Sequence, residues 1–150
     1  MSTIDSYNIL STEEIVVAQY SRTQVTPRTA LATDTAADEA KLWDDALDRM
    51  LEWRKTPEQF EPEDAPDLAV LDTAIDYAVD ERTDGGVAPV SIVPSGNGRV
   101  AFEWHSHGAI MLIEFVERGR AVYTRFVDGK VEEKGQLVRD PKSRKLELSD

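Results

Sequence analysis

Apolar residues recur every three or four positions between residues 35 and 54, which predicts an amphipathic helix over that range. Its apolar stripe is made of Leu42, Trp43, Ala46, Leu47, Met50 and Leu51. Thr56 and Pro57 follow, and proline disfavours helical geometry in the residue before it. We therefore expect the helix to end at about Arg54.

A second stripe with the same spacing predicts a helix that starts near Asp64 and ends at Asp84. Its apolar positions are Leu68, Leu71, Ala74, Ile75, Ala78 and Val79. Asp64 is a candidate N-cap, Pro66 is tolerated in a first turn, and Gly85 permits a left-handed C-cap. Because the connection between the two helices is short, we expect an antiparallel pair whose stripes face a sheet.

After the second helix the period falls from near 3.6 to two, which predicts β-strands. The strands are expected at 90–93, 99–104, 110–116, 121–127 and, as a weaker edge strand, 131–138. Turn-forming residues separate them, and Asp128-Gly129 is the strongest hairpin signal. The prediction is an α+β fold, with an N-terminal helical pair packed on a four- to five-stranded antiparallel meander.

The length of 150 residues fits one domain. We expect a flexible N-terminal segment over residues 1–33, a single α+β domain over 34–138 and a charged C-terminal tail over 139–150. The chain has no cysteine, which excludes disulfides, thiolate metal sites and a cysteine nucleophile. The N-terminus shows no signal-peptide pattern and no apolar run is long enough to span a membrane, so we expect a cytoplasmic protein.

The negative charge is concentrated in one part of the chain. The net charge is −12, and residues 34–84 alone carry 17 acidic and 5 basic side chains. Such a field repels phosphates and anionic headgroups, so we expect neither nucleic acid nor a membrane as a direct partner. No phosphate-binding loop, nucleophile elbow or calcium loop is recognisable, and we expect no cofactor.

Acidic residues occur every four positions in each predicted helix, as Asp44, Asp48 and Glu52 and as Asp72, Asp76 and Asp80. Like charges at this spacing destabilise a helix, so neutralising the second row should raise stability slightly. The rows indicate either a solvated face that keeps the protein soluble or a surface that docks a basic partner. Trp53, at the edge of the first stripe, either contacts that partner or packs under the following loop.

The two histidines offer a different chemistry. If the strand before them continued, Glu103, His105 and His107 would lie on one face and supply ligands that suit zinc or iron(II). However, Gly108 places the histidines at an expected hairpin turn, which would break the alternation. We therefore expect no metal here.

Two glutamates, Glu103 and Glu114, lie inside apolar strands. On one face they would form a general acid/base pair. The alternative is that both lie on the solvent side of the sheet or pair with Arg99, Arg118, Arg120 or Arg125.

Four short segments of the predicted sheet carry a resemblance. They are Ile92-Val93-Pro94, then Gly98, then Phe102-Glu103-Trp104, then Leu112-Ile113-Glu114-Phe115. Through them, residues 89–128 resemble an uncharacterised group of small bacterial proteins. The resemblance supports the strand assignments and implies no activity and no site.

The sequence is best interpreted as a non-enzymatic interaction module whose acidic helical face, with Trp53 beside it, docks a basic protein. Adaptor, antitoxin-like and immunity-like roles fit this interpretation equally. The alternative is a small metal-assisted enzyme that uses His105, His107 and Glu103.

Overall fold

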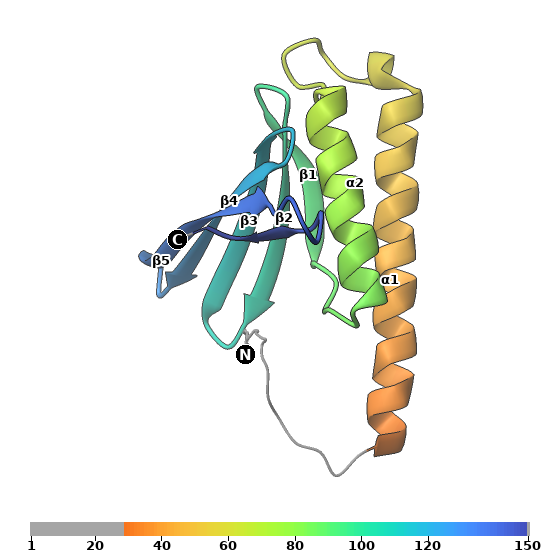
Figure 1. Cartoon of the computed structure of the whole chain (residues 1–150), viewed down its shortest axis with the longest axis vertical. Coiled ribbons are helices and arrows are strands. Elements are labelled where there is room, and N and C mark those ends of the chain that lie inside the picture. Colours follow the sequence, from red (N-terminus) through yellow and green to blue (C-terminus); the bar gives the residue numbers. More distant parts are fainter. Residues whose placement is uncertain (1–28, 150) are drawn as a thin grey trace. The chain divides into compact units, whose positions relative to one another are not determined.

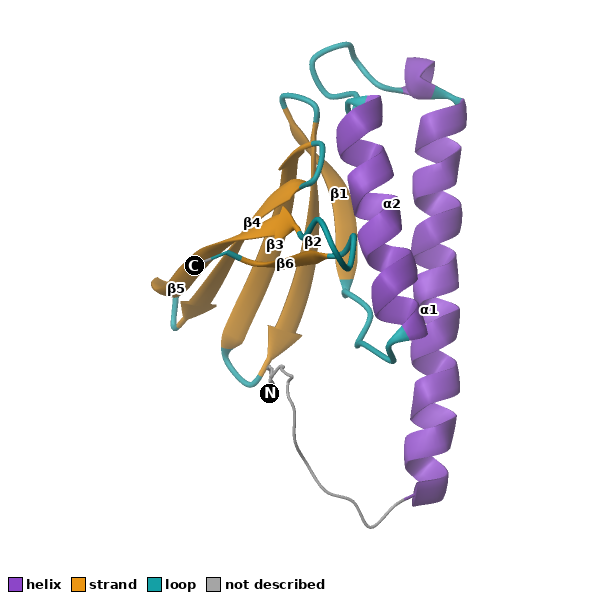
Figure 2. Ribbon diagram, in the orientation of Figure 1, coloured by secondary structure: helices purple, strands orange, loops and turns teal. Residues whose placement is uncertain are grey.

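The computed structural model describes residues 29–149, which form two helices followed by an antiparallel sheet (Figures 1 and 2). The helices are α1 (Thr29–Lys55) and α2 (Leu68–Thr83), with a short 3-10 helix, η1 (Pro57–Gln59), between them. The strands are β1 (Ser91–Gly96), β2 (Arg99–Ser106), β3 (Ala109–Glu117), β4 (Arg120–Val127), β5 (Lys130–Arg139) and β6 (Leu146–Leu148). Their order in the sheet follows their order in the chain. The predicted α+β fold is confirmed, with one strand more than expected.

The chain divides into two compact units. One, which we call the helical unit, contains residues 35–102, 113–123 and 135–150; the described residues of the other are 29–34, 103–112 and 124–134. The flexible segment expected over residues 1–33 lies mostly outside the described residues, and the single domain over 34–138 stays a prediction. The helical unit holds both acidic rows.

The core of the helical unit is built around aromatic rings. The rings of Phe102 on β2 and Phe115 on β3 have centroids 4.8 Å apart. Tyr77 of α2 lies against both, at 6.1 and 5.5 Å, and Trp43 of α1 lies 6.3 Å from Phe102. Tilted and edge-on contacts of this kind stabilise a core beyond the apolar area they bury. They determine which side of each helix faces inward.

The buried side of α1 is rotated from the predicted stripe. It consists of Trp43, Ala46, Met50 and Trp53, whereas Leu42 and Leu51 are about half exposed, at 50% and 48%. The prediction was therefore wrong for those two leucines. The reason is that apolar residues cover a wide arc of this helix, and the two tryptophans occupy the side that packs inward.

The buried side of α2 shows a similar change. Val70 and Thr73 join Leu71, Ala74 and Ala78 in the interior. Leu68 and Val79, which belonged to the predicted stripe, are 56% and 45% exposed. The helix also begins later than expected, because residues 61–65 form turns closed by the N–H of Asp64 and the carbonyl of Glu61 at 2.8 Å.

Three hairpin turns have positive φ at both central residues: Asn97-Gly98, His107-Gly108 and Asp128-Gly129. This is the turn geometry that matches the twist of paired strands. As a result β2 continues through Ser106, so the histidine turn is narrower than predicted.

The edge strand β1 passes through Pro94, which was expected to end it. Proline is tolerated there because an edge strand has one side without a neighbouring strand. The guanidinium of Arg49 on α1 donates a hydrogen bond to the carbonyl of Ile92 at 3.3 Å. This contact covers part of an edge that would otherwise be open to pairing with another chain.

The C-terminal residues, expected to be a charged tail, add the sixth strand. Antiparallel pairing joins β6 to β5, with Leu137 opposite Leu148. The carboxylate of Asp140 accepts the N–H groups of Lys142 and Ser143, at 3.1 and 2.7 Å, and so closes the turn between these strands. The turn brings a basic segment beside α2.

Candidate interaction face

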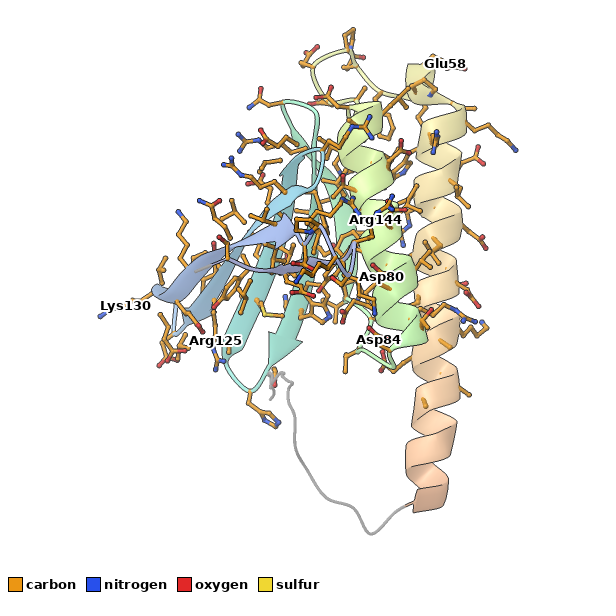
Figure 3. The ribbon with its side chains drawn as sticks, viewed as in Figure 1. Glu58, Asp80, Asp84, Arg125, Lys130 and Arg144 are labelled. Atoms are coloured by element: carbon orange, nitrogen blue, oxygen red, sulfur yellow. The ribbon has the colours of Figure 1, made fainter. Side chains whose placement is uncertain are left out.

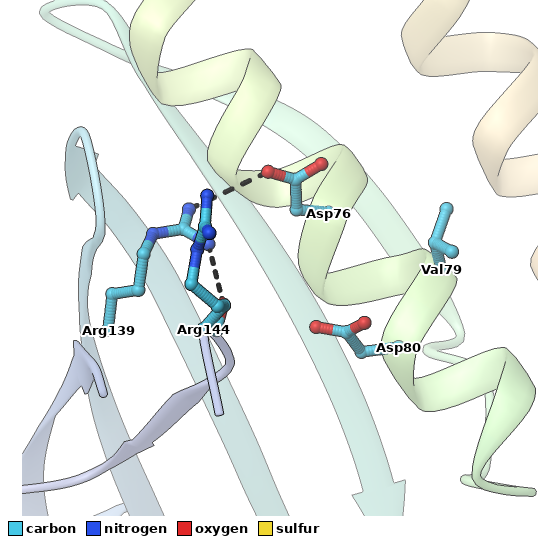
Figure 4. Close-up of a pocket in the computed structure, with 5 residues that line it drawn as sticks. All are labelled: Asp76, Val79, Asp80, Arg139 and Arg144. Carbon is cyan, nitrogen blue, oxygen red and sulfur yellow. Dashed lines mark hydrogen bonds and ion pairs between the residues drawn. The ribbon is translucent and has the colours of Figure 1, made fainter. Parts of the chain in front are cut away.

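The acidic row of α2 is largely used inside the molecule. Asp72 accepts a hydrogen bond from Arg54 of α1, and Asp76 lies 3.6 Å from Arg139 of β5. Asp80 lines a cavity of about 300 Å³ together with Arg139 and Arg144. Figure 4 shows Asp76 and Asp80 on the side of α2 that faces these arginines. This row is therefore compensated by neighbouring cations and does not form an open acidic ridge.

The end of α2 is tied to the same basic segment. Lys145 lies 3.0 Å from Asp84, just beyond the last turn of the helix, and the hydrogen bond and charge of Asp84 raise the pKa of Lys145. Figure 3 shows Asp80 and Asp84 along the lower half of α2, at the level of the C-terminal strands.

The acidic row of α1 is compensated at one position only. Asp44 accepts two hydrogen bonds from Arg82 of α2, at 2.7 and 3.2 Å, and they raise the pKa of Arg82. The side chains of Asp48 and Glu52 are exposed, and their carboxylates make no hydrogen bond or ion pair with another described residue. Asp45, also exposed, lies on the same outer side of the helix. These three carboxylates form an uncompensated acidic patch on the outer side of α1.

The two ion pairs between the helices determine their register. Asp44 pairs with Arg82, and Arg54 pairs with Asp72. Moving ten residues forward along α1 thus moves ten residues back along α2, so the helices are antiparallel, as predicted. At a rise of 1.5 Å per residue, the two ion pairs are about 15 Å apart along the helix axes.

Apolar side chains lie between these ion pairs. They come from both helices at four-residue spacing and are Leu47 and Leu51 of α1 and Ile75 and Val79 of α2. Leu51 and Val79 are 48% and 45% exposed, while Leu47 and Ile75 are half-buried. In Figure 4 Val79 projects from α2 toward α1, and it also lines the edge of the cavity that contains Arg139 and Arg144. We call these four residues the interhelix strip.

Trp53 does not belong to this surface. It is 8% exposed, and its ring packs edge-on against Phe60 at a centroid distance of 6.1 Å. The geometry agrees with the alternative in which Trp53 packs under the loop that follows α1. Its indole is not presented to a partner in this structure.

The histidine turn does not gather a ligand set. His107 adopts a left-handed conformation with φ 46° at the turn, whereas His105 is still in β2 and contacts Glu103. Burial lowers the pKa of His107. Within residues 29–149, no three histidine, aspartate or glutamate side chains come together in a way that would hold a metal ion.

The two strand glutamates have separate partners. Glu114 accepts a hydrogen bond from the hydroxyl of Ser95 at 3.0 Å and lies 3.6 Å from Arg99. Glu103 pairs with His105. Arg99 was among the partners expected for these glutamates, whereas His105, the partner of Glu103, was not.

Two buried polar groups of α1 hold the loop that leads from α2 to β1. The indole N–H of Trp43 donates to the carbonyl of Gly86 at 2.8 Å, and Glu39 accepts the N–H of Ala88 at 2.7 Å. Burial raises the pKa of Glu39, and the hydrogen bond from Ala88 opposes that effect. No local pattern predicts either contact, because each joins residues more than forty positions apart.

The inner side of α2 carries two further polar groups that sequence reasoning missed. Thr73 is 1% exposed; its hydroxyl donates to the carbonyl of Ala69 at 3.0 Å and accepts the N–H of Gly119 at 2.9 Å. Burial, with Asp84 and Asp80 nearby, raises the pKa of Glu81 to about 7, although Lys145 opposes the shift. Glu81 could have been singled out because it is a charged residue at helical spacing from Val70, Ala74 and Tyr77, on the inner side of α2.

Comparisons with known proteins add no identification: no family model, no curated protein and no solved structure matches the chain. The likeness of residues 89–128 to the uncharacterised bacterial group therefore rests on the quoted residues alone. Within the described part of the chain, neither helix is both long and apolar enough to cross a membrane.

Proposed function

We propose that this protein is a non-enzymatic interaction module, located in the cytoplasm, that binds a basic protein through the outer side of its helix pair. The supporting observation is the interhelix strip, an exposed apolar surface bordered by the uncompensated carboxylates Asp45, Asp48 and Glu52. An apolar centre with a charged border is the arrangement that recurs in protein–protein interfaces.

The distribution of ion pairs supports α1 as the binding side. On α2, Asp72 and Asp76 pair with Arg54 and Arg139, and just after the helix Asp84 pairs with Lys145. These cations reduce the attraction that the carboxylates exert on an approaching cation. In the α1 row, Asp44 is the one member with an ion-pair partner among the described residues. The proposal therefore moves the docking surface from the two acidic rows together to α1 and the interhelix strip, and it leaves out Trp53.

The expected mechanism has two steps. Long-range attraction to the acidic side of α1 would speed encounter with a basic surface, because electrostatic steering acts mainly on the association rate. Burial of Leu51 and Val79 would then stabilise the complex, because both side chains expose apolar area to water in the free protein. Adaptor, antitoxin-like and immunity-like roles are all compatible with such binding.

The test begins with tagged protein purified from its own cells, and with the partner that co-elutes. The triple variant Asp45→Asn, Asp48→Asn, Glu52→Gln should slow association with that partner about tenfold at low salt and flatten its salt dependence. The matched control is Glu58→Gln, Glu61→Gln, Glu63→Gln, which removes the same charge from exposed positions in the connection between the helices. Equal slowing by both triple variants would mean that only net charge matters, and the proposed face would be rejected.

A further inference from the structure

The proposed function leaves open what part of the partner binds, and the interhelix strip constrains it. We propose that the strip binds a single amphipathic helix of the partner, with apolar residues on one side and lysine or arginine on its borders. This inference rests on the proposed function and goes further, because a basic loop or a basic sheet edge would satisfy the function but not the inference.

The first argument is the shape of the surface. Leu47 and Leu51 follow one helix, while Ile75 and Val79 follow the other in the opposite direction. Residues four apart on a helix lie about 6 Å from each other along its axis. A third helix presents side chains at nearly the same interval, so its apolar side chains can alternate with these four.

The second argument concerns the backbone. Both walls of the strip are helices, whose interior N–H and carbonyl groups are already hydrogen-bonded within the helix. The strip therefore offers no backbone edge to which an extended peptide could add as a strand. An extended segment that bound here would give up its backbone hydrogen bonds with water and find no replacement on the strip. A helix satisfies its backbone N–H and carbonyl groups internally.

The third argument is charge. Uncompensated carboxylates at Asp48 and Glu52 border the strip on the α1 side. A second copy of this chain would bring its own net charge of −12 toward this face, so its approach would be opposed by repulsion. A helix with basic borders meets the acidic border with opposite charge.

The length of the strip sets the length of the partner's helix. The ion pairs at its two ends are about 15 Å apart, which corresponds to roughly ten residues of helix. Three helical turns therefore cover the strip, and their apolar positions would follow an i, i+3 or i+4, i+7 pattern.

The experiment uses the full chain and two labelled peptides of the same leucine and lysine composition. One peptide has its leucines at helical spacing, and the other has leucine and lysine in strict alternation, which favours a strand. Fluorescence anisotropy over a salt series measures both affinities. We expect the helical-pattern peptide to bind at least about tenfold more tightly, and that advantage to disappear in Leu51→Gln/Val79→Gln. The control Val90→Gln/Leu148→Gln changes two exposed apolar residues outside the strip. It should leave the affinity advantage of the helical-pattern peptide unchanged.

The outcomes separate the two proposals. If both peptides bind equally and both weaken in the Asp45/Asp48/Glu52 triple variant, the face attracts basic segments of any form, so the helix inference fails while the proposed function stands. If neither peptide binds, the helix inference also fails, and the proposed function is decided by association with the co-eluting partner. Self-association of the protein that is lost in Leu51→Gln/Val79→Gln would assign the strip to a second copy and overturn the inference.

Discussion

Thr73 offers a sharp test of how α2 is held on the sheet. Its buried hydroxyl bridges the carbonyl of Ala69, within the helix, and the N–H of Gly119, in the turn between β3 and β4. Thr73→Val keeps the shape of the side chain but leaves the Gly119 N–H without its acceptor. Because a buried donor without a partner costs about 1–3 kcal/mol, we expect a loss of that size in the free energy of unfolding. For a protein of this length, the loss corresponds to a melting temperature lower by roughly 2–4 °C per kcal/mol.

The same helix supplies a matched control. The hydroxyl of Thr83 donates to the carbonyl of Val79 at 2.9 Å and lies on an exposed residue. Within residues 29–149 it accepts no backbone N–H from another element. Thr83→Val makes the same side-chain change as Thr73→Val but removes no acceptor from a buried N–H. It should therefore alter the free energy of unfolding by less than about 0.5 kcal/mol. Urea denaturation measures both, and an unchanged slope would show that the unfolded state is not affected. If Thr73→Val were no more destabilising than Thr83→Val, the bridge to Gly119 would contribute nothing and the argument would be refuted.

Two further predictions concern charge. Asp72→Asn should lower the free energy of unfolding by about 0.2–1 kcal/mol in urea denaturation, because it removes the ion pair with Arg54. Asp48→Asn, the control, should be neutral or slightly stabilising. A gain in stability at Asp72 would mean that repulsion along the helix outweighs the ion pair. Since the pKa of Glu81 is raised to about 7 in the folded protein, the folded state binds this proton more tightly than the unfolded state does, and stability should fall as pH rises from about 4.5 through 7. Glu81→Gln should remove that part of the pH dependence, on the order of 1–3 kcal/mol between pH 5 and 8, and parallel pH profiles for the two proteins would contradict it.

The elements of the fold could be predicted because their signals are local. The helical period before residue 84, the alternation after it and the X-Gly turns are all visible within short windows of sequence. The boundaries were less accurate for a physical reason. Helix α1 begins at Thr29, where the alanine- and threonine-rich sequence shows no apolar stripe, and β1 runs through Pro94 because it is an edge strand.

The candidate site could be predicted only in part, because its decisive contacts are long-range. Four-residue spacing identified the acidic rows, but it treated both rows alike. What distinguishes them is which cations fold against each row, and Arg139 and Lys145 lie in a segment that was expected to be a tail. At Asp72, where the ion pair with Arg54 opposes the repulsion along the helix, we therefore expect neutralisation to lower stability rather than raise it.

The exposed leucine of the interhelix strip and the misassigned stripe have one cause. Helix α1 carries more apolar residues than a single inward side can bury, because its inward side is already filled by Trp43, Met50 and Trp53. Leu51 is left on the side toward α2, where the ion pairs hold the helices in register but do not cover it. Single exposed leucines are common, but two exposed apolar residues on facing helices, bordered by uncompensated carboxylates, form a surface with a centre and a border. That combination, rather than the acidity of the chain as a whole, is what favours a specific basic partner over simple solubility.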